Sequence, residues 1–187
     1  LSPKTSPVLT EVGARVRPKF VREWLLWGPA SGKPGATMPD PLHGLADVER
    51  RQTADELTHY LESLARGDLS DDVPANRFAR EQGRVLFHRV GCVACHAPRE
   101  AAADVFPNST GPTDQDTIRF VLKRLEQSSV PLGDVSAKYT RASLARFLLD
   151  PLASRPAGRM PSLNLTTNEA RALATYLIGI PPPSAAD

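Results

Sequence analysis

The stretch Cys92-Val93-Ala94-Cys95-His96 lies near the middle of the 187-residue chain and contains its only two cysteines. A redox-active C-x-x-C pair of the thioredoxin type would begin a helix in a βαβ context, but no strand pattern lies nearby. A structural zinc site would need a second pair of Cys or His ligands at metal spacing, and the sequence has none. The histidine directly after the second cysteine points to another chemistry.

That chemistry is the covalent attachment of haem, for which C-x-x-C-H is the typical sequence. Two thiols three positions apart can each add to one vinyl group of the porphyrin. The histidine that follows can then face the iron as its proximal ligand. We therefore expect one haem c, attached through Cys92 and Cys95, with His96 bound to the iron.

A sixth iron ligand is expected from the methionines, of which the chain has only Met38 and Met160. Each stands four residues after one proline and directly before another. A thioether on such a stiffened loop suits the distal side of haem iron, because the loop fixes the sulfur before it binds. Most methionines fill apolar cores, but Met160 lies far from any helical apolar stripe. We therefore predict Met160 as the distal ligand.

Several further motifs accompany the attachment sequence over about half of the chain. They are Gly83-Arg84-Val85-Leu86-Phe87, Pro131-Leu132-Gly133-Asp134-Val135, Lys138-Tyr139, Gly158-Arg159-Met160-Pro161, Leu165-Thr166, Glu169-Ala170 and Leu173-Ala174-Thr175-Tyr176-Leu177. Taken together, residues 76–177 resemble a class I cytochrome c. The resemblance implies an all-α fold with one haem c, ligated by His96 and Met160, that transfers electrons. The stretch 97–130 is longer than a compact member of that family needs.

Apolar periodicity independently predicts a helix before the attachment motif. Asn76 is a suitable N-cap for a helix that continues to about Arg89. Gly83 within it costs roughly 1 kcal/mol of helix stability relative to Ala. A close crossing by another helix would explain that cost, and the aromatic residue Tyr176 is the natural candidate to pack there.

The closing helix is expected to begin with a capping box formed by Thr166 and Glu169. Its apolar face follows helical spacing and comprises Ala170, Leu173, Ala174, Leu177 and Ile178. Two further helices are expected over 115–127 and 142–149. No stretch shows the sustained alternation of apolar and polar residues that strands require, so the chain is predicted to be all-α with long loops.

The first third of the chain resembles the second half of the predicted haem domain. The matched segments are 11–15 with 134–138, 24–26 with 147–149, the two Pro-x-x-x-Met-Pro frames, and 57–61 with 173–177. Residues 48–53 then look like an insertion, and Thr53 with Glu56 would form a capping box three residues out of register. The predicted organisation is a half-repeat without C-x-x-C-H at 1–68, a linker at 69–75, a cytochrome c domain at 76–180 and a proline-rich tail at 181–187.

Two interpretations of this half-repeat remain open. In the first it is a relic, and it packs apolar side chains against the haem domain without binding iron: Trp24, Leu25, Tyr60, Leu61 and Leu64. In the second, Met38 ligates a haem supplied by an upstream fragment, by a second chain, or by the chain's own motif in place of Met160. Exchange of the half-repeat between identical chains would give a homodimer.

Composition excludes some classes of function. The formal net charge is only +2, which argues against nucleic acid as a partner, and no apolar run reaches the length of a membrane span. His43, His59 and His88 lack ligand spacing and are expected to be surface or half-buried residues. Because guanidinium groups offer planar donors to carboxylates, haem propionates would be held by Tyr139, Arg155 and Arg159.

These observations favour an electron carrier that acts with a redox partner protein, alone or as a relay module of a larger oxidoreductase. With both axial positions filled, the iron would have no open site for substrate, so the chain itself is not expected to be an enzyme. The alternative is a five-coordinate haem that senses a small gas or acts like a peroxidase. Because haem c is attached outside the cytoplasm and no signal peptide is present, we expect a mature or trimmed chain located in the periplasm or at the cell surface.

Overall fold

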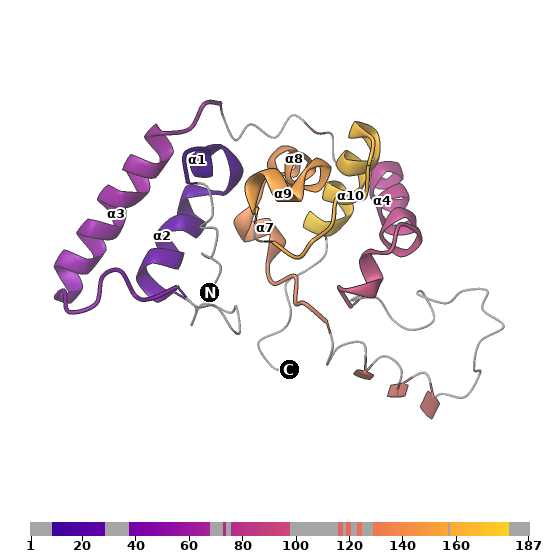
Figure 1. Cartoon of the computed structure of the whole chain (residues 1–187), viewed down its shortest axis with the longest axis horizontal. Coiled ribbons are helices and arrows are strands. Elements are labelled where there is room, and N and C mark those ends of the chain that lie inside the picture. Colours follow the sequence, from indigo (N-terminus) through magenta and orange to yellow (C-terminus); the bar gives the residue numbers. More distant parts are fainter. Residues whose placement is uncertain are drawn as a thin grey trace. The chain divides into compact units, whose positions relative to one another are not determined.

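The computed structural model describes residues 9–28, 38–67, 73, 76–97, 129–156 and 158–179, together with 116–117, 119–120 and 123–124. Within these ranges every regular element is helical and no strand occurs, which confirms the all-α prediction (Figure 1). The elements are α1 (Val12–Arg15), α2 (Pro18–Trp27), α3 (Asp47–Ser63), α4 (Arg77–Arg89), the 3-10 helix η2 (Cys92–Ala94), α7 (Val135–Lys138), α8 (Arg141–Leu149), α9 (Pro151–Ser154) and α10 (Thr167–Ile178).

Contacts divide the chain into two compact units. The first joins Leu1–Arg84 to Gly133–Asp187, and the second is Val85–Leu132. Helix α4 begins in the first unit and ends in the second. The predicted domain boundaries were drawn from sequence matches and not from contacts, and they stay a prediction. The predicted linker and tail fall almost entirely outside the described residues.

Two stretches of the first unit share the same order of elements. A four-residue helix, a longer helix, a proline-flanked methionine and a long helix follow one another in α1–α2–α3 and again in α7–α8–α10. Both four-residue helices end at a buried, extended residue, Val16 with φ −130° and ψ 151°, and Tyr139 with φ −122° and ψ 153°. We call these stretches the first copy (α1–α3) and the second copy (α7–α10).

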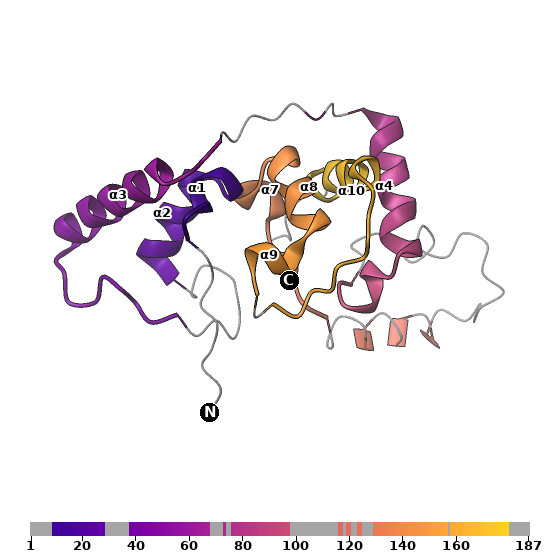
Figure 2. The same ribbon diagram turned by 45° about the horizontal axis from the view of Figure 1, so that its top comes forward.

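The packing within the two copies also corresponds. Helix α3 packs on α1 and α2, and α10 packs on α7 and α8 (Figure 2). The copies contact each other reciprocally, because α1 meets α8 while α2 meets α7. The Arg17 backbone N–H donates to the Lys138 carbonyl (2.9 Å), and Arg146 of α8 donates to the Ala14 carbonyl of α1 (2.9 Å). Such exchange of matching contacts is what a two-fold relation between two copies produces.

Helix α10 is the most buried element of the first unit. Its N-terminus has the predicted capping box, in which Thr166 accepts from the Glu169 backbone N–H and Glu169 accepts from that of Thr166. Buried positions surround the helix: Ala170, Ala172, Leu173, Ala174, Thr175, Tyr176 and Leu177. A helix buried on all sides needs neighbours on all sides.

One of those neighbours is α4, at the predicted glycine. A Cβ atom on Gly83 would lie 2.1 Å from the Ala172 carbonyl oxygen and 2.7 Å from the Tyr176 Cβ atom. The predicted close crossing at Gly83 with Tyr176 is therefore confirmed. The helix also begins as expected, because the Asn76 side chain accepts from the Ala79 backbone N–H at 2.7 Å.

Helix α8 begins one residue earlier than predicted and has a cap that the sequence reading missed. Thr140 and Ser143 form a capping box in which each side chain accepts from the other residue's backbone N–H. Of the helix predicted over 115–127, the structure describes only six residues, all of them helical.

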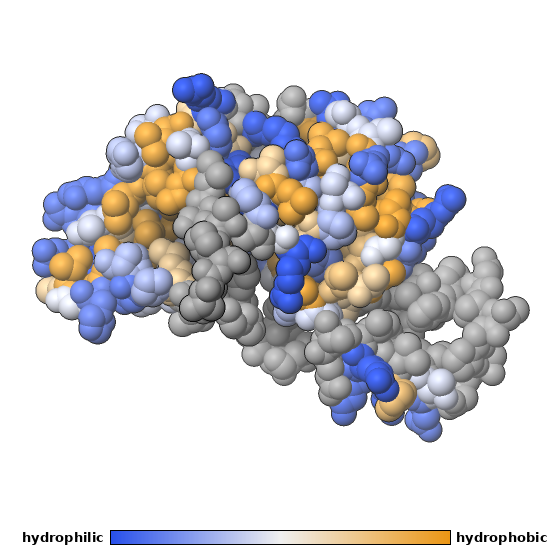
Figure 3. Space-filling view, viewed as in Figure 1, coloured by the Kyte–Doolittle hydropathy of each residue, from blue (hydrophilic) through white to orange (hydrophobic). Residues whose placement is uncertain are grey.

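Two expectations for the first copy were wrong. Thr53 and Glu56 do not cap a helix, because α3 already begins at Asp47 and continues through the presumed insertion. Residues 48–53 contain no helix breaker, and Asp47 and Glu49 lie in the first turn, where acidic side chains favour helix formation. Tyr60, which was expected to pack against the haem domain, is instead 60% exposed, and hydrophobic residues lie among hydrophilic ones on the surface over α3 (Figure 3).

Candidate functional site

The predicted attachment motif lies in the second unit, directly after α4. Gly91 has φ +95°, a left-handed conformation that glycine adopts without the steric cost of a side chain. It ends the helical segment and starts η2, in which the Cys95 and His96 backbone N–H groups donate to the Cys92 carbonyl at 3.2 and 2.9 Å. The two cysteines and the histidine therefore belong to one tight turn of chain.

Hydrogen bonds tie this turn to residues more than thirty positions later. The Val130 backbone N–H donates to the Cys95 carbonyl at 2.8 Å, and the Ala97 N–H donates to the Ser129 hydroxyl at 2.9 Å. The long stretch between them thus starts and ends at one place, whatever its own course. These bonds hold the motif between the end of α4 and residues 129–130.

The imidazole of His96 makes the third contact of this kind. Its Nδ1 atom lies 2.8 Å from the Val130 carbonyl oxygen. Because a carbonyl can only accept, this hydrogen bond places the proton on Nδ1 and leaves the lone pair on Nε2. Histidines that bind metals commonly have this arrangement, since it fixes the tautomer and the ring orientation.

The two thiols of the motif differ in environment. Both are free cysteines, with Cys92 half-buried and Cys95 exposed. Burial raises the pKa of the Cys92 thiol. Among the described residues no group of three or more His, Cys, Asp or Glu side chains could hold a metal ion, so the thiols have no further ligands there for a zinc site.

The predicted distal ligand lies in the first unit. Met160 is half-buried in the extended segment between α9 and α10, just after a turn in which the Gly158 N–H donates to the Arg155 carbonyl at 2.8 Å. His96 belongs to the other unit, and the pairing of Met160 with His96 stays a prediction.

Two of the three residues expected to hold propionates lie together, and the third is exposed. Arg155 donates to the Tyr139 hydroxyl at 3.2 Å, and its guanidinium lies over the Phe147 ring at 5.2 Å. Burial raises the pKa of Tyr139, although the charges of Arg155 and Arg15 act in the opposite direction. Arg159 is exposed. The Tyr139 hydroxyl therefore lies beside the Arg155 guanidinium, next to the aromatic ring of Phe147.

Met38 has a defined partner in the first copy. Its sulfur accepts a hydrogen bond from the indole N–H of Trp24 at 3.1 Å, and the side chain is 39% exposed. Phe20 stacks on Trp24 with ring centroids 6.0 Å apart. The first copy therefore holds its methionine against an aromatic pair on α2, and whether Met38 ever binds iron stays open.

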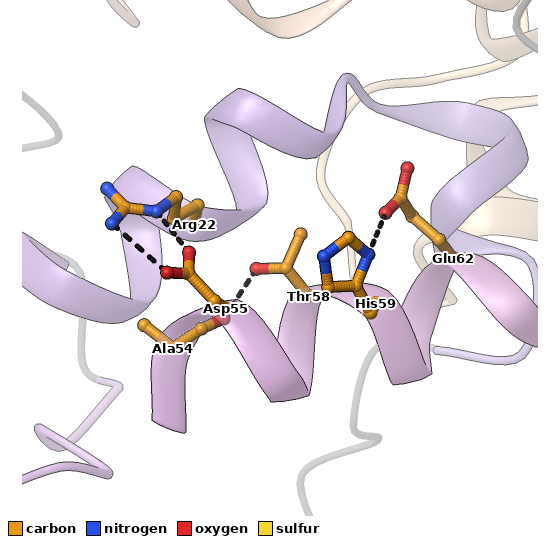
Figure 4. Close-up of polar contacts among 6 residues, drawn as sticks. All are labelled: Arg22, Ala54, Asp55, Thr58, His59 and Glu62. Carbon is orange, nitrogen blue, oxygen red and sulfur yellow. Dashed lines mark hydrogen bonds and ion pairs between the residues drawn. The ribbon is translucent and has the colours of Figure 1, made fainter. Parts of the chain in front are cut away.

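The other three histidines are exposed or half-buried, as expected. His59 lies 3.4 Å from Glu62 on the same helix, beside the hydrogen bond from the Thr58 hydroxyl to the Ala54 carbonyl (Figure 4). His43 is exposed, and His88 is half-buried with its ring edge against Phe87.

The ion pair of Arg22 and Asp55 in the same view joins α2 to α3 (Figure 4). It lowers the pKa of the Asp55 carboxyl through the hydrogen bond from Arg22. Because both side chains are substantially exposed, the pair positions two helices of the first copy rather than marking a reactive site.

Sequence reasoning singled out the two cysteines and the histidine of the motif but not the segment that contacts them. Val130 and Ser129 act through a backbone carbonyl and a hydroxyl, and neither belongs to a recognisable motif. The one available signal is Pro131, which favours an extended conformation in the residue before it and so leaves that carbonyl outside any helix.

Comparison with protein-family models, with curated proteins and with solved structures found no match to this chain. No helix in the described parts of the chain has both the length and the apolar character that crossing a bilayer requires.

Proposed function

We propose that the chain is a monohaem electron carrier with a class I cytochrome c fold. The observation that carries the proposal is the turn at Cys92, Cys95 and His96, in which the imidazole Nδ1 is committed to the Val130 carbonyl. Two thiols at the attachment spacing and one imidazole with Nε2 left for a metal are the donor set that haem c requires. The residues present therefore fit this cofactor.

When bound, the haem supplies an iron centre that gains and loses one electron. Cys92 and Cys95 would hold it through thioether bonds, and His96 would supply the proximal nitrogen. The hydrogen bond to Val130 would fix the tautomer and the orientation of the imidazole ring. Met160 is proposed as the distal ligand on the basis of its sequence frame, and a thioether there favours the reduced iron.

This ligand set explains why we propose a carrier rather than an enzyme. Iron with two protein ligands has no open position for a substrate. Electrons would instead pass through the exposed haem edge during a brief encounter with a redox partner protein, for which a small interface is sufficient. The chain could serve alone or as a relay module of a larger redox protein. Its proposed location is the periplasm or another extracytoplasmic space, where haem c is attached.

The test is to produce the chain together with a haem-ligation system and to determine its haem content and spectrum. We expect one covalent haem per chain and, in the ferric state, the far-red charge-transfer band of sulfur bound to iron. Met160→Ala should abolish that band, whereas Met38→Ala should leave it intact. Cys92→Ala together with Cys95→Ala should leave a colourless chain.

Other outcomes of the same experiment would reject the proposal. A colourless wild-type chain would remove its basis. Haem that lacks the sulfur band and binds carbon monoxide or peroxide would instead favour a sensor or a peroxidase-like domain. Loss of the band in Met38→Ala alone would transfer the distal role to the first copy.

A further inference from the structure

Helix α3 carries two parallel stripes of side chains, one of which is buried while the other is only partly covered. The first stripe faces α1 and α2 and includes the buried residues Ala54 and Thr58. The second, which we call the Tyr60 stripe, comprises Thr53, Leu57 and Tyr60 and continues to the C-cap residue Leu64. Thr53, Leu57 and Leu64 are half-buried. The spacing of four, three and four residues within the stripe is that of a seam along which a second helix packs. Tyr60, at its centre, is 60% exposed.

The residue of the second copy that corresponds to Tyr60 is covered. Tyr60 corresponds to Tyr176 in the match of 57–61 with 173–177, and Tyr176 is only 3% exposed. The helix that lies against Tyr176 and Ala172 is α4, which approaches closely because Gly83 has no side chain. The contact of α4 with α10 therefore shows how a helix can cover a tyrosine at this position.

Charge indicates the kind of helix that would fit α3. This helix carries five carboxylates against two arginines: Asp47, Glu49, Asp55, Glu56 and Glu62 against Arg50 and Arg51. Two α3 helices from separate copies of the chain would therefore repel each other. Helix α4 has the opposite balance, with four arginines against the single carboxylate of Glu81: Arg77, Arg80, Arg84 and Arg89.

We propose that the Tyr60 stripe of α3 is a docking surface for a basic amphipathic helix from a partner protein, with a small residue at the crossing point. Glu56 occupies the position that corresponds to Ala172, where it offers a carboxylate to an arginine of the incoming helix. Glu56 is exposed and already accepts a hydrogen bond from Gln52 at 2.9 Å, so the carboxylate is held at the edge of the stripe. The partner helix would cover Tyr60 of α3 as α4 covers Tyr176 of α10.

The probe is a labelled synthetic peptide of residues 76–91, cross-linked between positions 81 and 85 to keep it helical. Both positions are exposed in α4, so the cross-link avoids the crossing face. The peptide is titrated into the full 187-residue chain, and its fluorescence anisotropy is measured. We expect saturable binding that Tyr60→Ala weakens by about tenfold or more, because exposed aromatic anchors dominate such interfaces.

Matched controls separate this surface from others. Val48→Ala changes an 80% exposed residue of the same helix that lies about 120° around the axis from Tyr60, and it should leave the affinity unchanged. A peptide with Gly83→Leu should bind at least about tenfold more weakly, because the close approach is lost. Added salt should weaken binding, and Glu56→Gln should reduce that dependence on salt.

Three results would overturn the proposal. The first is the absence of saturable binding by the helical peptide. The second is equal affinity for the wild-type chain and Tyr60→Ala, which would mean that the peptide displaces α4 from α10 instead. The third is concentration-dependent dimerisation of the chain that Tyr60→Ala abolishes, which would assign the surface to a second copy. None of these measurements depends on haem, so they stand apart from the test of electron transfer.

Discussion

Gly83 shows how one residue can reverse an ordinary rule of helix stability. Replacing glycine by alanine within a helix normally stabilises it by about 1 kcal/mol. Here the added methyl group would lie 2.1 Å from the Ala172 carbonyl oxygen, on a rigid helix backbone that cannot give way easily. We expect Gly83→Ala to lower the free energy of unfolding by about 1–3 kcal/mol, the usual cost of overpacking.

Chemical denaturation of the two forms measures this difference. The control is Gln82→Ala, because Gln82 is an exposed neighbour on the same helix, and its effect should stay within about 0.5 kcal/mol. A stabilised Gly83→Ala variant would show that α4 does not cross α10 at this position.

At the scale of the helix, the Thr140 hydroxyl supplies one of the two side-chain acceptors in the capping box of α8. The Thr140 side chain accepts from the Ser143 backbone N–H at 3.1 Å, and both residues are buried. Thr140→Val keeps the shape of the side chain but removes this acceptor. We expect the free energy of unfolding to fall by about 1–2 kcal/mol, as for loss of a typical N-cap. Thr140→Ser retains the hydroxyl and should recover most of that loss in the same thermal or urea titration.

The cap of α10 makes a contribution that depends on pH. Two hydrogen bonds of 2.8 Å, from the Thr166 backbone N–H and hydroxyl to Glu169, lower the pKa of that carboxyl below its ordinary value of 4.5. A lowered folded-state pKa gives stability that is present above the unfolded value and is lost as pH falls through the folded value.

Unfolding measured from neutral pH to well below 4.5 tests this effect. The wild-type chain should exceed Glu169→Gln in stability at neutral pH, and the difference should shrink as the carboxyl is protonated. A difference that stays constant across this range would mean that the charge of Glu169 plays no part in the cap.

Elements were predictable from the sequence where a side chain itself makes the decisive contact. Asn76 and Thr166 cap their helices by accepting hydrogen bonds, so the starts of α4 and α10 could be read directly. Thr53 misled because the same pattern also occurs inside a helix, and the real start of α3 has Ala46 as N-cap, without a side-chain hydrogen bond. Acidic residues in the first turn were the only sign of that start.

In the candidate site, too, side chains could be predicted from the sequence but backbone contacts could not. Cys92, Cys95 and His96 could be proposed as haem-binding residues from their spacing alone, because the chemistry of haem attachment requires those residue types at those positions. The Val130 carbonyl that orients His96 could not be predicted, since every residue has a carbonyl and only the closure of the intervening loop brings this one to the imidazole. A contact made by a backbone carbonyl across a long loop does not require any particular residue type, so the sequence does not reveal it.

For the first unit as a whole, the important feature is the reciprocal contact between the two copies. Matching segments of the sequence predict a repeat, but they do not predict which surfaces the two copies share. Arg17 has no apolar character, and yet its guanidinium donates to the Ser136 and Tyr139 carbonyls at 3.1 and 3.2 Å. It caps the end of α7 in the other copy, where carbonyl groups have no partner within the helix.

This contact predicts that both copies unfold together. Arg17→Ala removes the bonds to the two carbonyls of the second copy and should cost about 1–2 kcal/mol, as charged hydrogen bonds do. Arg22→Ala is the matched control, because its exposed ion pair with Asp55 lies within the first copy and should stabilise the chain much less than the bonds of Arg17 do.

Amide hydrogen exchange resolves the outcome by helix. If the copies form one cooperative unit, Arg17→Ala lowers the protection of the core amides of α3 and of α10 by the same factor, since both exchange through the same opening. If only α3 loses protection while α10 keeps it, the first copy opens independently and the reciprocal contacts do not couple the two. Equal loss in both helices would make the first copy part of the scaffold that supports α10, and with it the surface on which α4 packs at Gly83.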